Sequence, residues 1–187
     1  MPRFKVVAGG QTGVDQAALH AAAALGIETG GFVLADGTDE RGPIPLLKEW
    51  KLVPVTDDMW EMHRGFFMNL GIEFNADDPF QRRALMNAWD SSGTLTVLPQ
   101  AVKDGTNLGI AAVNALKRPM LTFTMQEDSA TARKMFCDWL RDHSIEVLNI
   151  NGPRESSVPG IHEASKAIFE DLFNHAIHSI FGEKPES

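Results

Sequence analysis

Ala8-Gly9-Gly10-Gln11-Thr12-Gly13-Val14-Asp15 is the stretch that joins a short apolar run, Phe4–Ala8, to an alanine-rich run, Asp15–Leu25. The first run is typical of a buried strand, and the second of a helix with an acid in its first turn. Glycines in such a turn let the backbone approach a ligand closely, and the start of the helix offers unpaired N–H groups to a phosphate. We therefore expect the backbone of Gly9, Gly10, Gln11, Thr12 and Gly13 to bind a phosphate, with Asp15 beside it.

This turn has a more specific interpretation and a plainer one. It is no P-loop, because no Lys-Ser or Lys-Thr pair follows the glycines. It nearly matches the dinucleotide fingerprint, with Ala8 in place of the first glycine and Asp36 about twenty residues further on, where an acid that binds ribose would lie. The plainer alternative is a tight turn between a strand and a helix that binds nothing.

Outward from this turn, strand-like and helix-like runs alternate along the chain, which is typical of a parallel sheet. Further strands are expected at Gly31–Leu34, Thr94–Leu98, Met120–Thr124 and Glu146–Ile150, and further helices at Pro79–Trp89, Thr106–Leu116, Asp128–His143 and Ile161–Phe181. The pattern predicts an α/β fold. We expect a Rossmann-like three-layer sandwich whose mainly parallel sheet of about five strands carries helices on both faces.

One stretch does not fit this alternation. Lys48–Asp78 carries Trp50, Trp60 and several phenylalanines among acids, and we interpret it as a partly helical insertion that covers a site or a subunit interface. The expected organisation is a single ligand-binding domain over residues 1–182, with the insertion around 57–79 and a flexible tail at 183–187.

The composition is that of an ordinary globular protein of 187 residues, 43% of them hydrophobic. A formal net charge of −8 argues against nucleic-acid binding, although backbone N–H groups still allow a small anionic ligand. The single cysteine, Cys137, and the lack of a signal-like or membrane-spanning segment predict a cytoplasmic protein with no membrane partner. The six histidines form no recognisable metal motif, so no metal site is predicted.

Two later loops would join the glycine-rich turn at the carboxyl edge of the sheet, where open α/β folds bind their ligands. The loop Gln100–Gly109 supplies Gly105, Thr106 and Asn107, and the loop Asn149–Ser156 supplies Gly152, Arg154, Glu155 and Ser156. Arg154 can clamp a phosphate with two hydrogen bonds. The plainer alternatives are a capped helix start for the first loop and an exposed Arg154–Glu155 ion pair for the second.

A fourth polar loop, Thr38–Pro45, follows the second expected strand. Its Gly-Pro and Ile-Pro steps favour an extended path with turns. The acids of this loop and Arg41 either face the ligand or are solvated loop charges, and we favour the second interpretation.

Taken together, these loops resemble the family of molybdenum carrier proteins. Besides Gly9–Asp15, Gly105-Thr106 and Asn149–Ser156, the matching residues are Thr29-Gly30-Gly31, Gly42-Pro43-Ile44-Pro45, Arg83, Asn87, Asp90-Ser91, Gly93-Thr94-Leu95 and Pro159-Gly160-Ile161. The chain departs from the family at Gln16, where an arginine is common, and at Ser92, where an acid is common.

The resemblance implies a Rossmann-like fold in a wider nucleotide-binding superfamily, which also contains the lysine-decarboxylase-like phosphoribohydrolases. It implies a homo-oligomer, with a tetramer as the expected state. It also implies binding of molybdenum cofactor, a pterin that carries a phosphate, and it adds Arg83 and Asn87 to the expected ligand-binding residues.

Three functions follow from these residues and this resemblance. The first is a carrier of molybdenum cofactor that catalyses no reaction, in agreement with the lack of a nucleophile motif such as Gly-x-Ser-x-Gly. The second is an enzyme that hydrolyses nucleoside phosphates, with Asp15, Asp104 or Glu155 as acid or base. The third is a nucleotide sensor. An NAD(P)-dependent oxidoreductase is least favoured, because the chain has no tyrosine.

Overall fold

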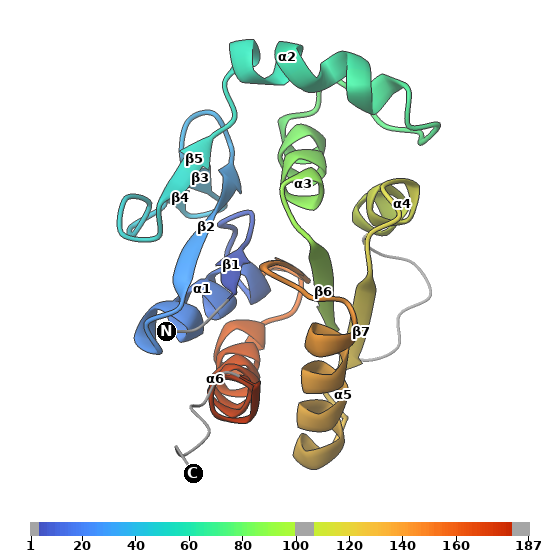
Figure 1. Ribbon diagram of the computed structural model, residues 1–187. Helices are drawn as coiled ribbons and strands as arrows, with labels where there is room; N and C mark the ends of the chain where they lie inside the picture. The colour runs from blue at the N-terminus through green and yellow to red at the C-terminus, as the bar shows by residue number, and fades with distance from the viewer. Residues whose placement is uncertain (1–3, 100–106, 181–187) are drawn as a thin grey trace.

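A six-stranded parallel sheet forms the centre of the computed structural model, which describes residues 4–99 and 107–180 (Figure 1). The strand order is β5-β2-β1-β8-β6-β7, and each neighbouring pair is parallel. The strands are β1 (Lys5–Val7), β2 (Glu28–Val33), β5 (Leu52–Pro54), β6 (Gly93–Leu98), β7 (Met120–Thr124) and β8 (Val147–Asn151). Two short strands, β3 (Thr38–Asp39) and β4 (Gly42–Pro43), pair antiparallel as a separate hairpin.

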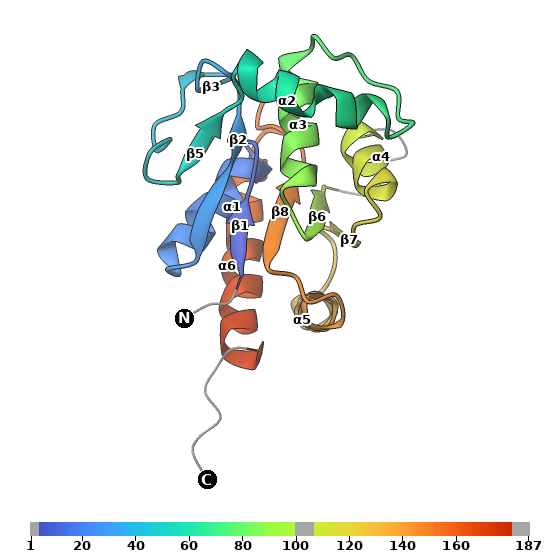
Figure 2. The same cartoon turned by 45° about the horizontal axis from the view of Figure 1, so that its top comes forward.

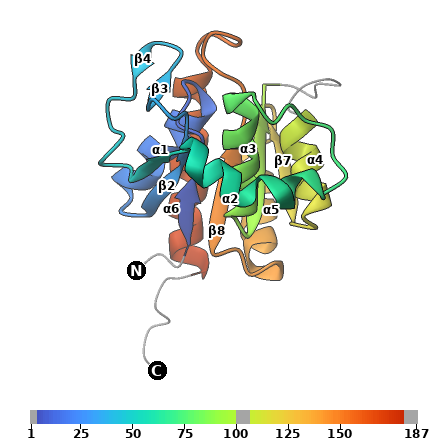
Figure 3. The ribbon, with the colours of Figure 1, turned by 90° about the horizontal axis from the view of Figure 1, so that it is seen from above.

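Helices cover both faces of this sheet. They are α1 (Val14–Ala24), α2 (Asp57–Met68), α3 (Pro79–Trp89), α4 (Asn107–Ala115), α5 (Ser129–Asp142) and α6 (Ile161–Ile180). One hydrophobic core joins the sheet to α1, α5 and α6, and a second joins α2, α3 and α4. Figures 2 and 3 show α2 lying across α3 at one end of the molecule. The predicted three-layer sandwich is therefore confirmed.

All five strands and all five helices expected from the sequence are present in the described residues, and α3 and β7 have the predicted bounds. The sheet has six strands rather than about five, because β5 lies inside the stretch interpreted as an insertion. β5 has three residues and ends in Pro54, so it gives no apolar run to recognise. It pairs only with β2 at the edge of the sheet, where a proline is tolerated.

The stretch interpreted as a partly helical insertion contains α2, an amphipathic helix that begins at a Thr56 cap. Trp60 and Phe67 on its inner side are fully buried in the second core, and their rings stack 5.5 Å apart. This inner face therefore packs on the same chain, against α3. Its outer side exposes Met62, Phe66 and Met68.

The strand order creates a crevice at the carboxyl edge of the sheet. From β1 the chain moves outward through β2 to β5, returns through α2 and α3 to β6, and moves outward again to β7. β8 then inserts between β1 and β6. The connections after β1 and β6 therefore leave in opposite directions on either side of β8, and such a reversal is where open α/β proteins bind ligands. The sequence-predicted loops after β1 and β8 meet at this point.

Some residues named by the sequence analysis lie outside the described residues. They are Gly105 and Thr106 of the predicted second loop, the candidate acid or base Asp104, and the predicted tail at 183–187. Asn107 begins α4. Within residues 4–99 and 107–180, no helix is long and apolar enough to cross a membrane.

Candidate functional site

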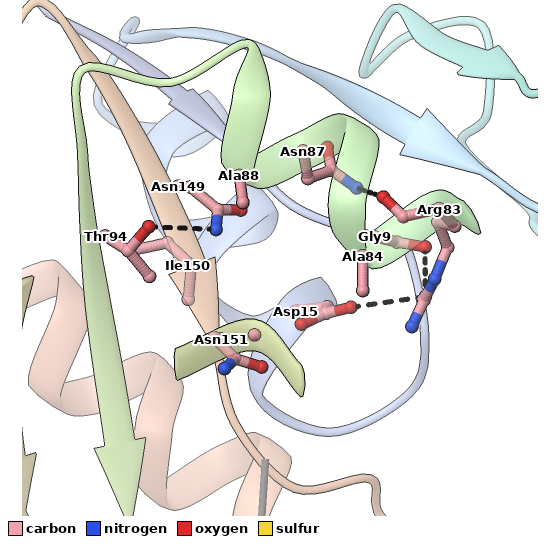
Figure 4. A pocket seen from close by; sticks show the side chains of 11 residues that line it. Gly9, Asp15, Arg83, Ala84, Asn87, Ala88, Thr94, Asn149, Ile150 and Asn151 are labelled. Atoms are coloured by element: carbon pink, nitrogen blue, oxygen red, sulfur yellow. Dashed lines mark hydrogen bonds and ion pairs between the residues drawn. The ribbon is translucent and has the colours of Figure 1, made fainter. Parts of the chain in front are cut away.

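A small cavity lies between α3 and the sheet, beside the end of β1 (Figure 4). Its volume is about 40 Å³. A few waters or one small polar group would fill such a space. The cavity is lined by Gly9, Asp15, Arg83, Ala84, Asn87, Ala88, Thr94, Gly109, Asn149, Ile150 and Asn151. Four of these residues, Gly9, Asp15, Arg83 and Asn87, belong to the site predicted from the sequence.

A buried ion pair dominates one side of the cavity. The guanidinium of Arg83 donates from Nη1 to the Gly9 carbonyl at 2.6 Å and lies 3.6 Å from Asp15 Oδ2. A Cβ on Gly9 would lie 2.6 Å from Arg83 Cζ and 2.9 Å from Asp15 Oδ2. Only glycine therefore leaves room for this pair, because real side chains do not approach so closely. Figure 4 shows the three residues together at the α3 end of the cavity.

Burial and neighbouring charges both act on this pair. Burial raises the pKa of Asp15, although Arg83, the N–H groups of Gln11 and Gly9, and the charge of Arg154 act against that rise. Burial lowers the pKa of Arg83, and the charge of Arg154 lowers it further. Two guanidinium groups thus act on Asp15, and the carboxylates of Asp15 and Asp78 both act on Arg83. Among the described residues, the buried Nε of Arg83 has no hydrogen-bond partner. An oxygen-bearing group of a ligand would satisfy this free donor.

Polar side chains line the sheet side of the cavity, which is unusual because the strands of a parallel sheet are normally apolar. Asn149 on β8 donates to Thr94 Oγ1 on β6 at 3.2 Å. Asn151 lies two residues further along β8, in register with Thr96. The Thr96 hydroxyl, which does not line the cavity itself, is buried and has no hydrogen-bond partner among the described residues. These amides and hydroxyls suit the polar edge of a ligand ring. Sequence analysis placed Asn149 and Asn151 in a loop motif and gave them no role.

Asn87 has a structural use that the sequence did not reveal. Its side-chain amide accepts from the Phe32 N–H and donates to the Phe32 carbonyl, both at 2.8 Å. It thereby completes the hydrogen bonding of β2 beyond the point where β1 ends. Its role as a ligand contact stays a prediction.

The glycine-rich turn is buried more deeply than a phosphate-binding loop would need to be. A Cβ on Gly10, where φ is +71°, would meet side chains of Val33, Ile44 and Leu52 at 2.8 to 3.2 Å. Gly10 therefore faces apolar packing and not the polar cavity. The Gln11 N–H donates to Asp15 Oδ2 at 3.3 Å, so Asp15 occupies part of the donor set that the sequence assigned to a phosphate.

The third loop packs directly onto this turn. A Cβ on Gly13, where φ is +81°, would lie 2.5 Å from Pro153 O and 2.7 Å from Glu155 N. A Cβ on Gly152 would lie 2.6 Å from the side chain of Val14. Gly13 lies against the backbone of the third loop and Gly152 against the side chain of Val14, so close packing of the two loops accounts for both glycines. The predicted convergence of the first and third loops is therefore present in the structure, independently of any ligand.

Two charged residues of the third loop have clear contacts. Arg154 lies over the ring of Phe80, with Cζ 4.6 Å from the ring centre. Glu155 caps α6, since its carboxylate accepts from the N–H groups of Gly160 at 2.5 Å and His162 at 2.9 Å. These two bonds lower the pKa of Glu155. The Arg154–Glu155 ion pair that sequence analysis offered as an alternative is not among the ion pairs of the described residues.

The β3–β4 hairpin, whose acids the sequence left as solvated charges, reaches into the same place. The carboxylate of Glu40 accepts from the hydroxyls of Thr12 and Ser156, and from the Ser156 N–H at 3.1 Å. The side chain of Gln16 links the hairpin to the glycine-rich turn, because it donates to Asp39 Oδ2 at 2.6 Å and to the Gly10 carbonyl at 3.0 Å. Gln16 therefore has a structural role, because it ties the hairpin to the glycine-rich turn.

A wider hollow of about 620 Å³ lies among α1, the hairpin and the start of α6. Its lining includes His20 and His162, whose ring nitrogens Nδ1 and Nε2 lie 3.2 Å apart. Of the predicted ligand-binding residues, only Glu155 lines it. Within the part of the chain that the structure describes, no group of three or more His, Cys, Asp or Glu side chains is arranged to hold a metal ion.

With this geometry established, comparisons with known proteins assign the family. A family model described as "Circularly permutated YpsA SLOG family" (cpYpsA) matches residues 6–173. The chain belongs to this family. The matched range runs from β1 into α6, so the cpYpsA match includes the cavity, the hairpin and the loops that surround them.

The chain is also similar to a crystal structure from Syntrophus aciditrophicus SB, described as "Putative molybdenum carrier protein". The two chains are 28% identical with a TM-score of 0.72, and the match covers 91% of this cpYpsA chain and 96% of the other. No curated protein matches the chain. The family model and this structure confirm the resemblance that the sequence motifs indicated.

Proposed function

We propose that this cpYpsA protein binds a small phosphate-bearing molecule at the carboxyl edge of the sheet and acts as a carrier. The observation that supports binding most directly is the buried ion pair of Arg83 with Asp15, on which the charge of Arg154 also acts. Within residues 4–99 and 107–180 the buried Nε of Arg83 has no hydrogen-bond partner, and the charges of Arg83 and Arg154 both act on Asp15. Such a site favours an anionic ligand. The carrier role draws on the relative from Syntrophus aciditrophicus SB, whose name includes that role.

Molybdenum cofactor is the first candidate for the ligand. The donors fit it in part: Arg83 can donate to an oxygen, and the amides of Asn149 and Asn151 can bind the polar edge of a pterin ring. A cavity of about 40 Å³ has room for one small polar group of the cofactor and not for a whole pterin. The remainder of the ligand would lie outside this cavity, and its molybdenum would be cargo.

An enzyme that acts on nucleotides is the second candidate. Asp15 favours it, because a buried carboxyl with a raised pKa inside a polar cavity is a common feature of acid–base catalysis. This candidate predicts that nucleoside monophosphates or ADP-ribose are cleaved during long incubation with the protein. If they stay intact, the carrier is the better account.

The test of binding uses Gly9→Ala. The added Cβ would displace the Arg83 guanidinium, so we expect affinity for a phosphorylated pterin or a nucleoside monophosphate to fall by at least about tenfold. Gly65→Ala is the matched control, since a Cβ there meets nothing within 4 Å. Calorimetric titration of the three proteins gives the answer. Equal affinity in Gly9→Ala and wild type would remove the cavity from the proposal.

A further inference from the structure

The carboxylate of Glu40 is held by hydrogen-bond donors from two other loops, as the anionic group of a ligand would be. Glu40 sits in the turn of the β3–β4 hairpin, yet its carboxylate lies between the glycine-rich turn and the third loop. One oxygen accepts from the Thr12 hydroxyl and the Ser156 N–H, and the other accepts from the Ser156 hydroxyl. We call these three donors the Thr12–Ser156 cradle. A set of hydroxyl and backbone donors converging on an anion is the arrangement that proteins use to bind phosphate.

The positive charge beside the cradle is shared with the cavity. The hydrogen bonds from Ser156 and Thr12 lower the pKa of the Glu40 carboxyl, and the charge of Arg154 lowers it further. The same arginine acts on Asp15 and Arg83 in the cavity. Arg154, two residues before Ser156 in the third loop, is therefore a positive charge that acts on both the cradle and the cavity.

Glu40 can leave the cradle without unfolding the hairpin. Its residue is exposed, so the side chain has room to rotate into solvent. The hairpin keeps a separate, buried attachment through Asp39, which accepts from Gln16 at 2.6 Å. Asp39 also accepts from the Arg41 N–H at 2.7 Å, a bond within the hairpin that holds its turn. Replacement of the carboxylate therefore requires only a side-chain movement.

From this arrangement we infer that the Thr12–Ser156 cradle is a phosphate subsite, and that Glu40 occupies it until the phosphate of a ligand takes its place. The inference rests on the proposed function and refines it. The phosphate binds in the cradle beside Arg154, which leaves the cavity around Arg83, Asn149 and Asn151 for the polar edge of the attached ring. Glu40 then acts as a tethered competitor that sets how tightly the phosphate is held.

The test removes the competitor and measures inorganic phosphate. A site that is competent for only a fraction of the time binds with an affinity reduced by that fraction. Glu40→Ala should therefore bind inorganic phosphate at least about tenfold more tightly than the wild type. Glu49→Ala is the control, because it removes the same charge at an exposed position elsewhere. Titration followed by amide NMR should show the largest shift at the Ser156 N–H of Glu40→Ala.

A double variant, Glu40→Ala with Ser156→Ala, checks the location. It removes the Ser156 hydroxyl and should lose most of the gained affinity. Unchanged phosphate affinity in Glu40→Ala, an equal gain in Glu49→Ala, or a largest shift away from the cradle would overturn the inference. The two proposals can fail separately. Glu40→Ala could bind inorganic phosphate in the cradle but bind nucleoside and pterin phosphates no more tightly than inorganic phosphate. In that case the subsite stands and the proposed function fails.

Discussion

At the scale of single residues, the Asp15–Arg83 pair places charged groups in a buried site at a cost to the stability of the fold. Both groups are buried, and burial is the largest influence on each pKa, raising that of Asp15 and lowering that of Arg83. The two groups are 3.6 Å apart, and the Arg83 Nε has no partner in the described part of the chain, so the described residues do not fully satisfy the pair. Incompletely compensated buried charges are common where a ligand supplies the missing contact.

The raised pKa of Asp15 gives a prediction for stability against pH. The unfolded chain has the ordinary value of 3.8, and the folded chain has a higher one, so the folded state binds more protons between the two values. Stability contributed by this group must then fall as pH rises through that interval. We expect the free energy of unfolding of wild type, minus that of Asp15→Asn, to decrease from about pH 4 upward and to level off above the raised pKa. Urea unfolding at several pH values measures this difference, and a difference that rises with pH would contradict it.

At the scale of elements, the sequence predicted most of what local patterns determine. Apolar runs such as Met120–Thr124 and the proline-started helix Pro79–Trp89 were found with their bounds. β5 was missed because three residues at a sheet edge carry no periodicity. The contact of Glu40 was missed for a related reason. A glutamate in a polar loop is solvated by default, and only the folded chain shows that Thr12 and Ser156 converge on it.

The packing of the third loop on the glycine-rich turn predicts that a side chain at Gly13 destabilises the protein. Gly13→Ala places a Cβ against the backbone of Pro153 and Glu155 at a φ of +81°, so we expect a loss of at least about 2 kcal/mol in the free energy of unfolding. Gly65→Ala lies within α2 with open space around it and should stabilise by about 0.5–1 kcal/mol. Urea unfolding of the two variants compares them directly. Similar effects at both positions would count against the close approach.

At the scale of the whole molecule, two cores lie on opposite faces of one sheet and share its strands. The first joins α1, α5 and α6 to the sheet, and the second joins α2, α3 and α4. The site forms where elements from both layers meet, since Arg83 comes from α3 and Asp15 from α1. The homo-oligomer implied by the family resemblance stays a prediction, and light scattering of the purified protein checks it.

Shared strands predict that the two cores unfold together. Trp60 is fully buried in the second core, so Trp60→Ala should lower the free energy of unfolding by about 3–5 kcal/mol. Phe169→Ala, on α6 in the first core, should have a similar effect. In both variants, circular dichroism and tryptophan fluorescence should follow one coincident transition. Separate transitions in Trp60→Ala would show that α2, α3 and α4 unfold on their own.

The central claim, that this cpYpsA protein carries a phosphorylated small molecule, is tested most directly by the ligand it retains. The wild type and Gly9→Ala are purified from cells and denatured, and the released small molecules are identified by mass spectrometry with molybdenum quantified in parallel. We predict a near-stoichiometric phosphorylated compound from the wild type, with matching molybdenum if it is the cofactor, and a large loss in Gly9→Ala. A wild type that releases no phosphorylated compound, or equal amounts from both proteins, would contradict the account.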